Sequence, residues 1–265
     1  MTEPSGKHRA RKRFGQNFLI DKQIISQILN AIDSQPEDHI VEIGPGLGAL
    51  TEGLLQNCDQ LTVVEIDRGL AAELSERYGN HPNFGLHQMD ALTLDFSTLS
   101  QGENLRVVGN LPYNISTPLL FHLLNYRHVI TDMYFMLQKE VVQRLAAAPG
   151  VKNYGRLSIM MQYHCQVRTL MTVPPEAFRP APKVTSAVVQ LVPHPRPPFH
   201  ATDLQIFDRL VRTCFQQRRK TLRNSLKLLP GGSDIKENQI DLSVRPESLS
   251  VEDFVTLANL LTRTD

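Results

Sequence analysis

The sequence predicts an α/β protein in which a mainly parallel sheet, covered by helices on both faces, is followed by a small all-helical domain. Up to about residue 190, short apolar strand-like runs alternate with helical segments, which is the pattern of such a sheet. A Pro-rich segment then interrupts regular structure, and beyond it the apolar residues recur at helical spacing. We therefore predict a first domain over residues 1–192, a linker over 193–200 and a helical domain over 201–265.

Each element of the first domain is predicted from its apolar pattern. A helix over 21–32 carries an apolar stripe that includes Ile24, Ile28 and Ile32. A second helix is expected to open at Ala49. Strands are predicted where short apolar runs are bounded by turn residues or polar residues, over 40–43, 61–64, 84–89, 105–109, 133–137, 167–173 and 187–192.

Four successive predicted strands each end in a glycine turn or a polar residue. The turn Gly44-Pro45-Gly46-Leu47-Gly48 follows the first strand, and Glu65, Asp90 and Asn110 follow the next three. In open α/β sheets, ligands bind at the carboxyl edge of the strands. Gly44 lets the backbone approach a ligand closely, and Glu65, about twenty residues further on, is placed to accept from ribose hydroxyls. The sequence therefore predicts a nucleotide site.

The glycine turn and Glu65 do not by themselves separate a dehydrogenase from a methyltransferase. The pattern Gly44-x-Gly46-x-x-Ala49 also fits the dinucleotide fingerprint. However, Pro45 and Gly48 suit a loop that curls around a nucleoside without a pyrophosphate. Asp90 is placed to accept from an adenine amino group. The segment that starts at Asn110 has no role in hydride transfer. We therefore predict S-adenosylmethionine as the cofactor, released as S-adenosylhomocysteine.

The segment Asn110-Leu111-Pro112-Tyr113 can grip an exocyclic amino group on a planar base. The Asn110 side-chain oxygen and the Leu111 carbonyl can each accept one N–H of the amine. Pro112 fixes its backbone dihedral, and Tyr113 offers a flat face for stacking. A strand end followed by a Pro turn and a buried Tyr is also common as plain structure. The segment therefore indicates a base-binding function only in combination with the glycine turn that precedes it.

Five motifs, in this order along the chain, resemble one family, the ribosomal RNA adenine dimethyltransferases. They are Arg11-Lys12-Arg13-Phe14-Gly15-Gln16-Asn17-Phe18-Leu19, Glu42-Ile43-Gly44-Pro45-Gly46, Asn110-Leu111-Pro112-Tyr113-Asn114-Ile115, Phe178-x-Pro180-x-Pro182-Lys183-Val184 and Gln217-Arg218-Arg219-Lys220-Thr221-Leu222-Arg223. The resemblance runs from about residue 7 to the C-terminus. It is strongest to the bacterial members that dimethylate two adjacent adenosines near the 3′ end of small-subunit RNA, whose loss gives kasugamycin resistance.

The resemblance adds several expectations. It implies a Rossmann-like methyltransferase sheet whose last two strands form an antiparallel hairpin at one edge. It implies that Asn17 and Leu19 line the site of the methyl donor and that Asn110 also lies beside it. Phe178 becomes the second stacking partner of the target base, opposite Tyr113, although from its position alone it serves equally well as a core anchor before the last strand.

Two basic segments are expected to contact RNA phosphates. Arg11, Lys12 and Arg13 are read on charge alone as a solvated tail, but apolar and amide residues continue the segment up to Leu19. In the helical domain a single long helix is predicted, with apolar residues on one face and cations on the other, namely Arg209, Arg212, Arg219, Lys220, Arg223 and Lys227. Such contacts position RNA rather than specify it.

Composition limits the other possibilities. The formal net charge is only +1, so the case for a nucleic-acid partner is local rather than global. Three dispersed cysteines and scattered histidines predict reduced thiols and no metal site. No apolar stretch is long enough for a signal peptide or a membrane span. We expect a cytoplasmic monomer without an obligate protein partner, which acts on small-subunit ribosomal RNA in a pre-ribosomal particle.

Two alternative functions remain open. One is a large-subunit ribosomal RNA adenine methylase that confers antibiotic resistance and uses the same donor and the same Asn-x-Pro-aromatic motif. The other is a non-catalytic RNA-binding assembly or transcription factor on the same fold. The intact glycine turn, Glu65, Asp90 and the segment at Asn110 argue against this second alternative.

Overall fold

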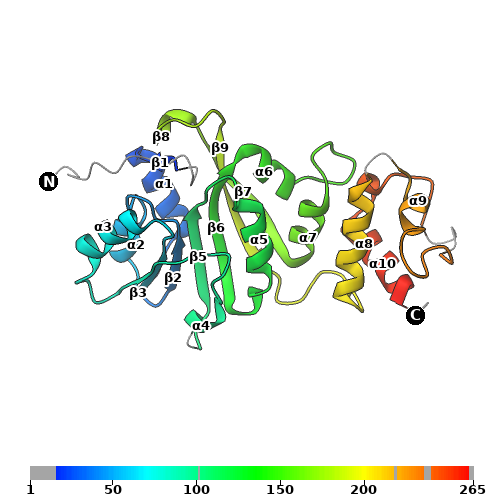
Figure 1. The fold of residues 1–265 in the computed structure, drawn as a ribbon, viewed down its shortest axis with the longest axis horizontal. Helices are drawn as coiled ribbons and strands as arrows, with labels where there is room; N and C mark the ends of the chain where they lie inside the picture. Colours follow the sequence, from blue (N-terminus) through cyan, green and yellow to red (C-terminus); the bar gives the residue numbers. More distant parts are fainter. Residues whose placement is uncertain (1–15, 101, 218–219, 236–239, 263–265) are drawn as a thin grey trace. The chain divides into compact units, whose positions relative to one another are not determined.

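The computed structural model describes residues 16–100, 102–217, 220–235 and 240–262. The chain forms two compact units, each of which combines two stretches of sequence (Figure 1). The first unit consists of Met1–Val142 and Arg168–Pro193, and the second consists of Gln143–Val167 and His194–Asp265.

The first unit is built on a seven-stranded sheet with the strand order β4-β3-β2-β5-β6-β9-β7. The strands are β2 (His39–Ile43), β3 (Gln60–Val64), β4 (Phe84–His87), β5 (Leu105–Asn110), β6 (Ile130–Gln138), β7 (Cys165–Val173) and β9 (Ser186–Pro193). The pairs from β4 to β6 are parallel, and β9 runs antiparallel to β6. The predicted α/β fold class is confirmed, and β7 and β9 are neighbours at one edge, where the resemblance placed the last two strands.

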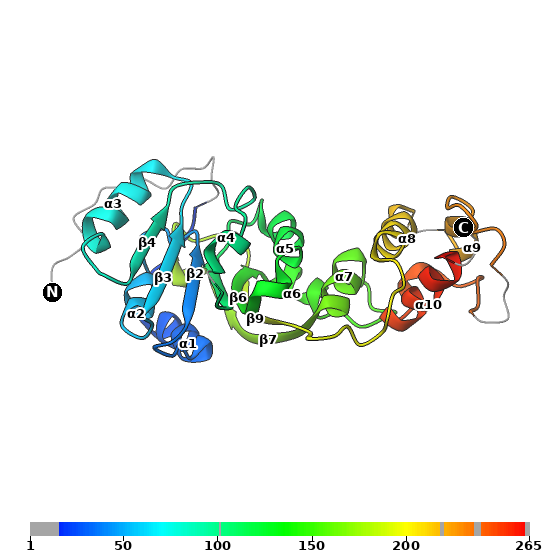
Figure 2. The same ribbon diagram turned by 90° about the horizontal axis from the view of Figure 1, so that it is seen from below.

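The helices that precede and follow the strands cover both faces of the sheet, and the last of them, α6, runs into the second unit. They are α1 (Lys22–Ile32), α2 (Thr51–Leu55), α3 (Arg68–Tyr78), α4 (Ser97–Ser100), α5 (Ser116–Leu124), α6 (Lys139–Leu145) and the 3-10 helices η2 (Arg127–Val129) and η3 (Pro175–Ala177). Figure 2 shows α1 and α2 on one side of the sheet and α5 on the other. Helix α1 starts at Lys22 because the Asp21 side chain accepts from two backbone N–H groups, those of Gln23 and Ile24.

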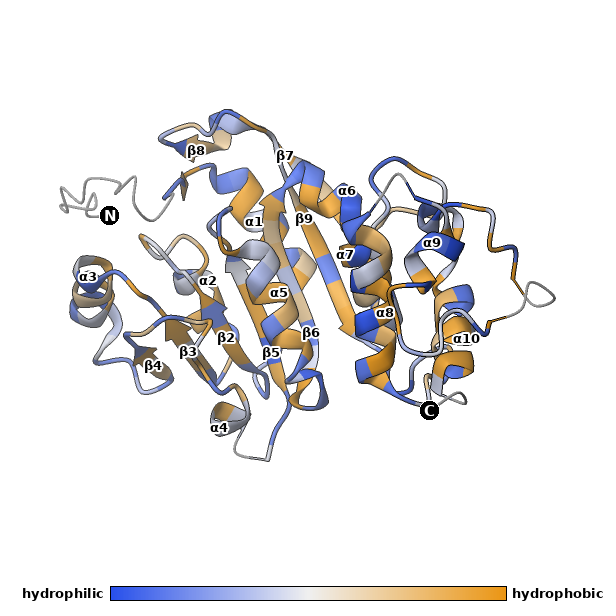
Figure 3. Cartoon of the chain, turned by 45° about the vertical axis from the view of Figure 1, so that its right-hand side comes forward, coloured by the Kyte–Doolittle hydropathy of each residue, from blue (hydrophilic) through white to orange (hydrophobic). Residues whose placement is uncertain are grey.

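The core follows the alternation of side chains along the strands. Ile40 of β2, Val63 of β3 and Val108 of β5 pack in one cluster with Ile28 of α1 and Leu54 of α2. Their strand neighbours in sequence point to the opposite face. Both faces are buried, which explains the nearly continuous apolar runs of the central strands, seen for β5 and β9 in Figure 3.

A short second sheet fixes the segment that precedes α1. β1 (Phe18–Leu19) pairs antiparallel with β8 (Phe178–Arg179), so that Leu19 lies opposite Phe178. The Ile20 amide also donates to the Ala177 carbonyl at 2.8 Å. The N-terminal segment is thus held by a part of the chain roughly 160 residues later in sequence.

The second unit is a cluster of helices. It contains α7 (Arg156–His164), α8 (Leu204–Gln216), α9 (Leu222–Leu226), the 3-10 helix η4 (Pro246–Ser248) and α10 (Val251–Thr262). Aromatic contacts form its core, with ring centroids 4.6 Å apart for Tyr163 and Phe207 and 5.9 Å apart for Phe215 and Phe254. Within the described residues, no helix is both long and apolar enough to cross a membrane.

Two predictions about this unit need correction. The single long helix is wrong, because α8 ends at Gln216 and α9 begins only at Leu222, after the extended residue Thr221. The apolar residues predicted for one face are nevertheless buried, apart from the half-buried Phe215; they are Phe207, Leu210, Val211, Cys214, Leu222 and Leu226. The two units also do not meet at a single boundary at residues 192/193, because each unit combines two stretches of sequence. The segment Gln143–Val167 belongs to the second unit, because α7 packs on α8 and α10.

Candidate active site

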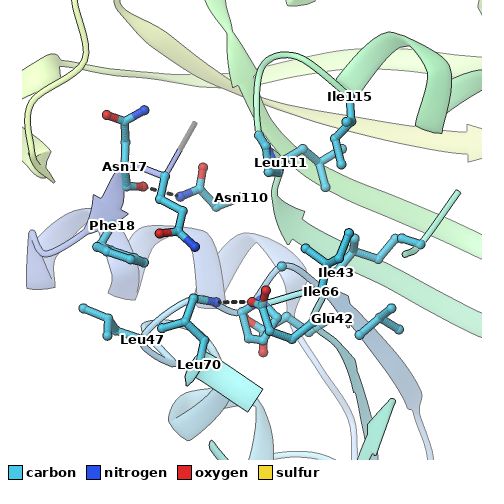
Figure 4. Close-up of a pocket in the computed structure, with 18 of the residues that line it drawn as sticks. Asn17, Phe18, Glu42, Ile43, Leu47, Ile66, Leu70, Asn110, Leu111 and Ile115 are labelled. Atoms are coloured by element: carbon cyan, nitrogen blue, oxygen red, sulfur yellow. Dashed lines mark hydrogen bonds between the residues drawn. The ribbon is translucent and has the colours of Figure 1, made fainter. Parts of the chain in front are cut away.

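A pocket opens in the first unit at the carboxyl ends of β2, β3 and β5 (Figure 4). It brings together most of the residues that the sequence predicts for the site. These are Asn17, Leu19, Gly44, Glu65, Asp90, Asn110, Leu111, Pro112 and Tyr113. The ends of these successive strands therefore meet at one pocket on this edge of the sheet, as predicted for the carboxyl ends of parallel strands.

The glycine turn after β2 forms one wall of the pocket. Gly44 and Gly46 have φ values of +66° and +60°, which side-chain-bearing residues rarely adopt. A Cβ atom added to Gly46 would lie 3.1 Å from Cδ1 of Phe18. Glycine at position 46 therefore satisfies two requirements, the left-handed backbone and the close approach of the Phe18 ring.

Glu65, at the end of β3, is a buried carboxyl that is only 5 % exposed. Its Oε1 accepts from the Asp67 amide at 2.8 Å, and its Oε2 accepts from the Gly46 amide at 3.4 Å. Burial raises the pKa of Glu65, and these backbone N–H groups oppose the shift. Because a carboxylate can accept about four hydrogen bonds, Glu65 keeps the capacity to accept from a ligand as well. Two neighbouring ribose hydroxyls match this arrangement.

Glu42 is a second buried acid in the pocket wall, and the sequence did not predict it as a site residue. It is 2 % exposed, and Thr51 Oγ1 donates to its Oε2 at 2.6 Å. The pKa of Glu42 is raised to about 7 by burial and, to a smaller extent, by the charge of Glu65, while the Thr51 hydrogen bond opposes the shift. The signal in the sequence was a single acid inside the apolar strand that leads into the glycine turn.

Asp90 and Ile66 form the part of the pocket beyond Glu65. Asp90 Oδ1 accepts from the Leu92 amide at 2.9 Å, and the carboxylate retains the capacity to accept from a ligand amine. Ile66 lines the pocket and is 47 % exposed. An exposed apolar side chain beside two carboxylates suits a flat heteroaromatic ring with a polar edge. Ile66 was missed because one apolar residue after a strand has no distinctive pattern.

The Asn110 side chain makes a hydrogen bond that orients its amide. Nδ2 donates to the Asn17 backbone carbonyl at 3.1 Å (Figure 4). This bond assigns Nδ2 as the donor end, so Oδ1 stays available as a neutral acceptor. Asn17 and Asn110 are thus brought together, as expected, although the contact uses the backbone of Asn17.

Tyr113 is held at both ends. Ser116 Oγ donates to its carbonyl at 3.1 Å, and its phenolic oxygen lies 2.8 Å from Oγ of Ser186. Burial raises the pKa of Tyr113. A nearby residue of the same turn, Leu111, is 1 % exposed, and its amide donates to the Met136 carbonyl at 3.2 Å. The turn between β5 and α5 is therefore firmly fixed to the sheet.

Phe178 is not brought to the pocket. It is 3 % exposed, belongs to the apolar cluster that includes Leu19, and pairs with Leu19 across β1 and β8. It is absent from the described pocket lining. The sequence left two roles open for Phe178, and the contacts described here are those of a core anchor. The stacking role of Phe178 stays a prediction.

The predicted RNA-contacting residues lie elsewhere in the chain. Arg11, Lys12, Arg13 and Arg219 fall outside the described residues. Lys220 and Arg223 are exposed and belong to the second unit. In the same unit, Asp208 accepts from both Arg156 and Arg212 at 2.9 and 3.0 Å, which reduces the charge of the predicted basic face along α8.

The charge of the pocket separates the two cofactor classes that the glycine turn left open. Its described lining contains three acids, Glu42, Glu65 and Asp90, and no Lys, Arg or His. Such a wall favours a cationic ligand and disfavours a pyrophosphate. Within the part of the chain that the structure describes, no three His, Cys, Asp or Glu residues are grouped as metal ligands.

Comparisons with known proteins agree with this geometry. The family model described as ribosomal RNA adenine dimethylase matches residues 7–263. The chain is 58 % identical over 255 residues to "Ribosomal RNA small subunit methyltransferase A" of Pseudomonas savastanoi pv. phaseolicola, covering 96 % of this chain and 95 % of that protein.

Two solved structures are similar over nearly their whole length. A dimethyladenosine transferase from Plasmodium falciparum has a TM-score of 0.78 and 28 % identity, covering 91 % of this chain and 95 % of that chain. The 23S rRNA methyltransferase ErmE has a TM-score of 0.68 and 26 % identity, covering 93 % of this chain and 100 % of that chain. From the family match over nearly the whole chain, and from the identity to its curated relative, we conclude that the chain belongs to the ribosomal RNA adenine dimethylase family.

Proposed function

We propose that this protein uses S-adenosylmethionine to dimethylate N6 of two adjacent adenosines in a loop near the 3′ end of small-subunit ribosomal RNA, in the cytoplasm, during subunit biogenesis. The observation that carries the proposal is the orientation of Asn110, whose Nδ2 is engaged by the Asn17 carbonyl at 3.1 Å. Its Oδ1 is thereby left as a neutral acceptor on a side chain that lines an acidic pocket, and such a pocket suits a cationic nucleoside. The name of the relative at 58 % identity supports the small-subunit substrate.

The residues present fit S-adenosylmethionine. Glu65 would hold the ribose hydroxyls, Asp90 the adenine amino group and Ile66 the adenine face. Gly44 would let the backbone approach, while Asn17 and Leu19 would close the site. When bound, the donor supplies an electrophilic methyl group on a positively charged sulfur. The buried carboxyl of Glu42 lies in the same wall.

The protein acts on the target base mainly by positioning it. Adenine N6 is a poor nucleophile because its lone pair is delocalised into the ring. Acceptance of its two hydrogens by Asn110 Oδ1 and the Leu111 carbonyl favours a pyramidal nitrogen with a localised lone pair. Tyr113 stacks on the base, which must leave its RNA stack to reach the pocket. No side chain is assigned as a general base, since the methylated amine is acidic and releases its proton to solvent.

The second methyl transfer places a stricter demand on the same residues. Monomethyladenine has one N–H left, so only one of the two acceptors, Asn110 or Leu111, keeps its hydrogen bond. The stacking contact with Tyr113 must then hold the ring while the first methyl group turns aside. We propose further that Arg11, Lys12, Arg13, Arg219, Lys220 and Arg223 contact RNA phosphates and that the protein acts as a monomer.

The test uses isotope-labelled S-adenosylmethionine with immature small subunits, mature small subunits and large subunits, followed by mass-spectrometric mapping of modified bases. We expect dimethylation of two adjacent adenosines in the immature small subunits alone. Modification of large-subunit RNA instead would favour the activity named for ErmE. Tight RNA binding with no methyl incorporation by the wild-type protein would favour a non-catalytic factor and contradict the proposal.

A further inference from the structure

Ser186 is a fully buried hydroxyl residue whose only described side-chain partner is Tyr113. Its exposed fraction is 0 %, and its Oγ lies 2.8 Å from the Tyr113 phenolic oxygen. Ser186 does not line the pocket, whereas Tyr113 does. A polar side chain at a fully buried strand position thus makes its hydrogen bond to a residue of the site, and its hydroxyl would be unsatisfied without that bond.

The direction of β9 explains how Ser186 reaches this position. Because β9 runs antiparallel to β6, its first residue lies at the same edge of the sheet as the carboxyl ends of the parallel strands, and Ser186 pairs with Gln138, the last residue of β6. Tyr113 follows β5, on the other side of β6 in the strand order. The Tyr113 side chain therefore spans the end of β6 to meet a residue that the sheet holds rigidly.

The bond to Ser186 completes the restraint on Tyr113. Ser116 Oγ fixes the backbone carbonyl of Tyr113, but this contact leaves the side-chain torsions free. The phenolic oxygen sits at the far end of the side chain, so a hydrogen bond there limits both torsions at once. The Tyr113 phenol is protonated at neutral pH, burial raises its pKa further, and either it or the Ser186 hydroxyl can donate in this bond.

We propose that Ser186 is a positioning residue, which acts through Tyr113 to hold the stacking face of the pocket at one angle to the acceptors Asn110 Oδ1 and Leu111 C=O. The inference rests on the proposed function and deepens it. The first transfer can use two N–H contacts to align the base, whereas the second has only one. The fixed orientation of the Tyr113 ring therefore matters more for the second transfer.

The test measures the first and second transfers separately, in single-turnover reactions with immature small subunits, by mass spectrometry of the RNA. For Ser186→Ala we expect the second transfer to slow about tenfold, the scale of one lost neutral hydrogen bond, and the first to slow less. Monomethyladenosine should accumulate. Affinity for S-adenosylhomocysteine, measured by calorimetry, should stay as in the wild type. Tyr113→Phe should also slow the second transfer and raise the share of monomethyladenosine.

A double-mutant cycle isolates the hydroxyl pair. If Ser186 acts only through Tyr113, the double variant (Ser186→Ala with Tyr113→Phe) should be as slow as either single variant. Ser186→Thr, which keeps the hydroxyl, should restore a normal ratio of mono- to dimethyladenosine. Ser100→Ala is the matched control. It removes another buried hydroxyl of the first unit, 7 % exposed, whose Oγ donates to the Glu103 carbonyl at 2.6 Å, and it should change the ratio little.

Three results would overturn the inference. One is a wild-type product ratio for Ser186→Ala, the second is multiplied effects in the double variant, and the third is an equal shift in Ser100→Ala. If Ser186→Ala fails to fold, Tyr113→Phe carries the same expectation alone, because it breaks the bond from the other side. A wild-type protein that methylates no RNA would instead overturn the proposed function, and this inference with it.

Discussion

At the scale of single residues, the side-chain amide of Asn110 both donates a hydrogen bond and offers an acceptor, and a single substitution removes both groups. Nδ2 is fixed by the Asn17 carbonyl at 3.1 Å, and Oδ1 is the acceptor proposed for the base. For Asn110→Ala we expect turnover to fall roughly a hundredfold or more, the effect of losing an aligned transition-state hydrogen bond. RNA binding should survive. Rates of methyl incorporation and filter-binding affinities measure the two quantities.

Asn83→Ala provides the control for Asn110→Ala. Asn83 also donates from Nδ2 to a backbone carbonyl, that of Cys58 at 3.3 Å, but it does not line the pocket. Its loss should leave turnover near the wild-type value. Near-normal dimethylation by Asn110→Ala would contradict the role of Asn110, whatever the control shows.

Glu65→Ala should weaken binding of the methyl donor. The carboxylate accepts backbone N–H groups from Asp67 and Gly46, and it keeps the capacity to accept from ribose hydroxyls. Leaving those hydroxyls unpaired should cost roughly 1.5–3 kcal/mol of binding free energy. Calorimetric titration with S-adenosylhomocysteine measures this loss, and Glu52→Ala, at an exposed acid of α2, is the control. Wild-type affinity in Glu65→Ala would rule out the ribose role.

Glu42 should make the stability of the first unit depend on pH. Burial raises the pKa of Glu42 from the ordinary value of 4.5 to about 7 in the folded protein. A carboxyl with a raised pKa contributes its full stability below the unfolded pKa and loses it as the pH rises through the folded pKa. Glu42→Gln stays neutral throughout. Relative to the wild type, its free energy of unfolding should rise between pH 4.5 and pH 7, by roughly 3 kcal/mol at most.

Denaturant titrations of the wild type and Glu42→Gln across this pH range give the comparison directly. The sign is the decisive result, because an ordinary solvated glutamate replaced by glutamine would give a difference that stays flat above about pH 5. A wild-type stability that increases from pH 5 to pH 7 relative to Glu42→Gln would mean that Glu42 is ionised and favourably paired in the folded protein.

At the scale of elements, the glycine turn and β1 depend on each other. A Cβ on Gly46 would meet Cδ1 of Phe18 at 3.1 Å, and the backbone there has a φ of +60°. Gly46→Ala should therefore combine left-handed strain of about 1–2 kcal/mol with displacement of β1 from the pocket. We expect lower stability and at least tenfold weaker donor binding, the equivalent of about 1.4 kcal/mol.

Gly102→Ala separates the two effects in Gly46→Ala. Gly102 also has a positive φ, +96°, but a Cβ there would meet nothing within 4 Å. This variant should lose stability from strain alone and bind the donor normally. Equal donor affinity in Gly46→Ala and Gly102→Ala would show that β1 does not contribute to the donor site.

The sequence predicts the strands of the sheet well, and it does not predict the break between α8 and α9. The strands of the parallel sheet are buried on both faces, so apolar runs such as 105–109 stand out, and the polar residue that ends each run marks the binding edge. The break between α8 and α9 was missed because Phe207 and Leu226 lie on a common apolar pattern that continues through the break. The spacing of apolar residues indicates which face of a helix is buried, but it does not indicate whether the helix is continuous.

At the scale of the whole molecule, the discontinuous units and the contact of Asn110 with Asn17 are results of packing between distant segments. Tyr163 joins the second unit because its ring packs on Phe207, with centroids 4.6 Å apart. No local sequence pattern predicts that Tyr163 belongs to the second unit. The placement of Phe178 has the same origin, since its partner Leu19 lies in a segment far away in sequence, and only their pairing puts the ring in the core cluster.

The pocket lies wholly in the first unit, whereas Lys220 and Arg223 belong to the second. Donor binding and RNA binding should therefore be separable by substitution. Reversing the two charges (Lys220→Glu with Arg223→Glu) should weaken RNA binding and flatten its dependence on salt, by a slope of about 0.7–0.9 for each phosphate that is no longer neutralised. Affinity for S-adenosylhomocysteine should not change.

Neutral variants at Lys220 and Arg223 show whether these two residues contact phosphates directly. Neutral Lys220→Gln with Arg223→Gln should lie between the wild type and the reversed variant in affinity, because counterion release scales with the number of neutralised phosphates. Its salt slope should match that of the reversed variant more closely, since both variants leave the same phosphates without a cation. Weaker RNA binding with an unchanged salt slope would mean that these residues shape the second unit and do not touch the phosphates. The charges would then serve only as a solvated surface, and RNA would have to be held by other cations.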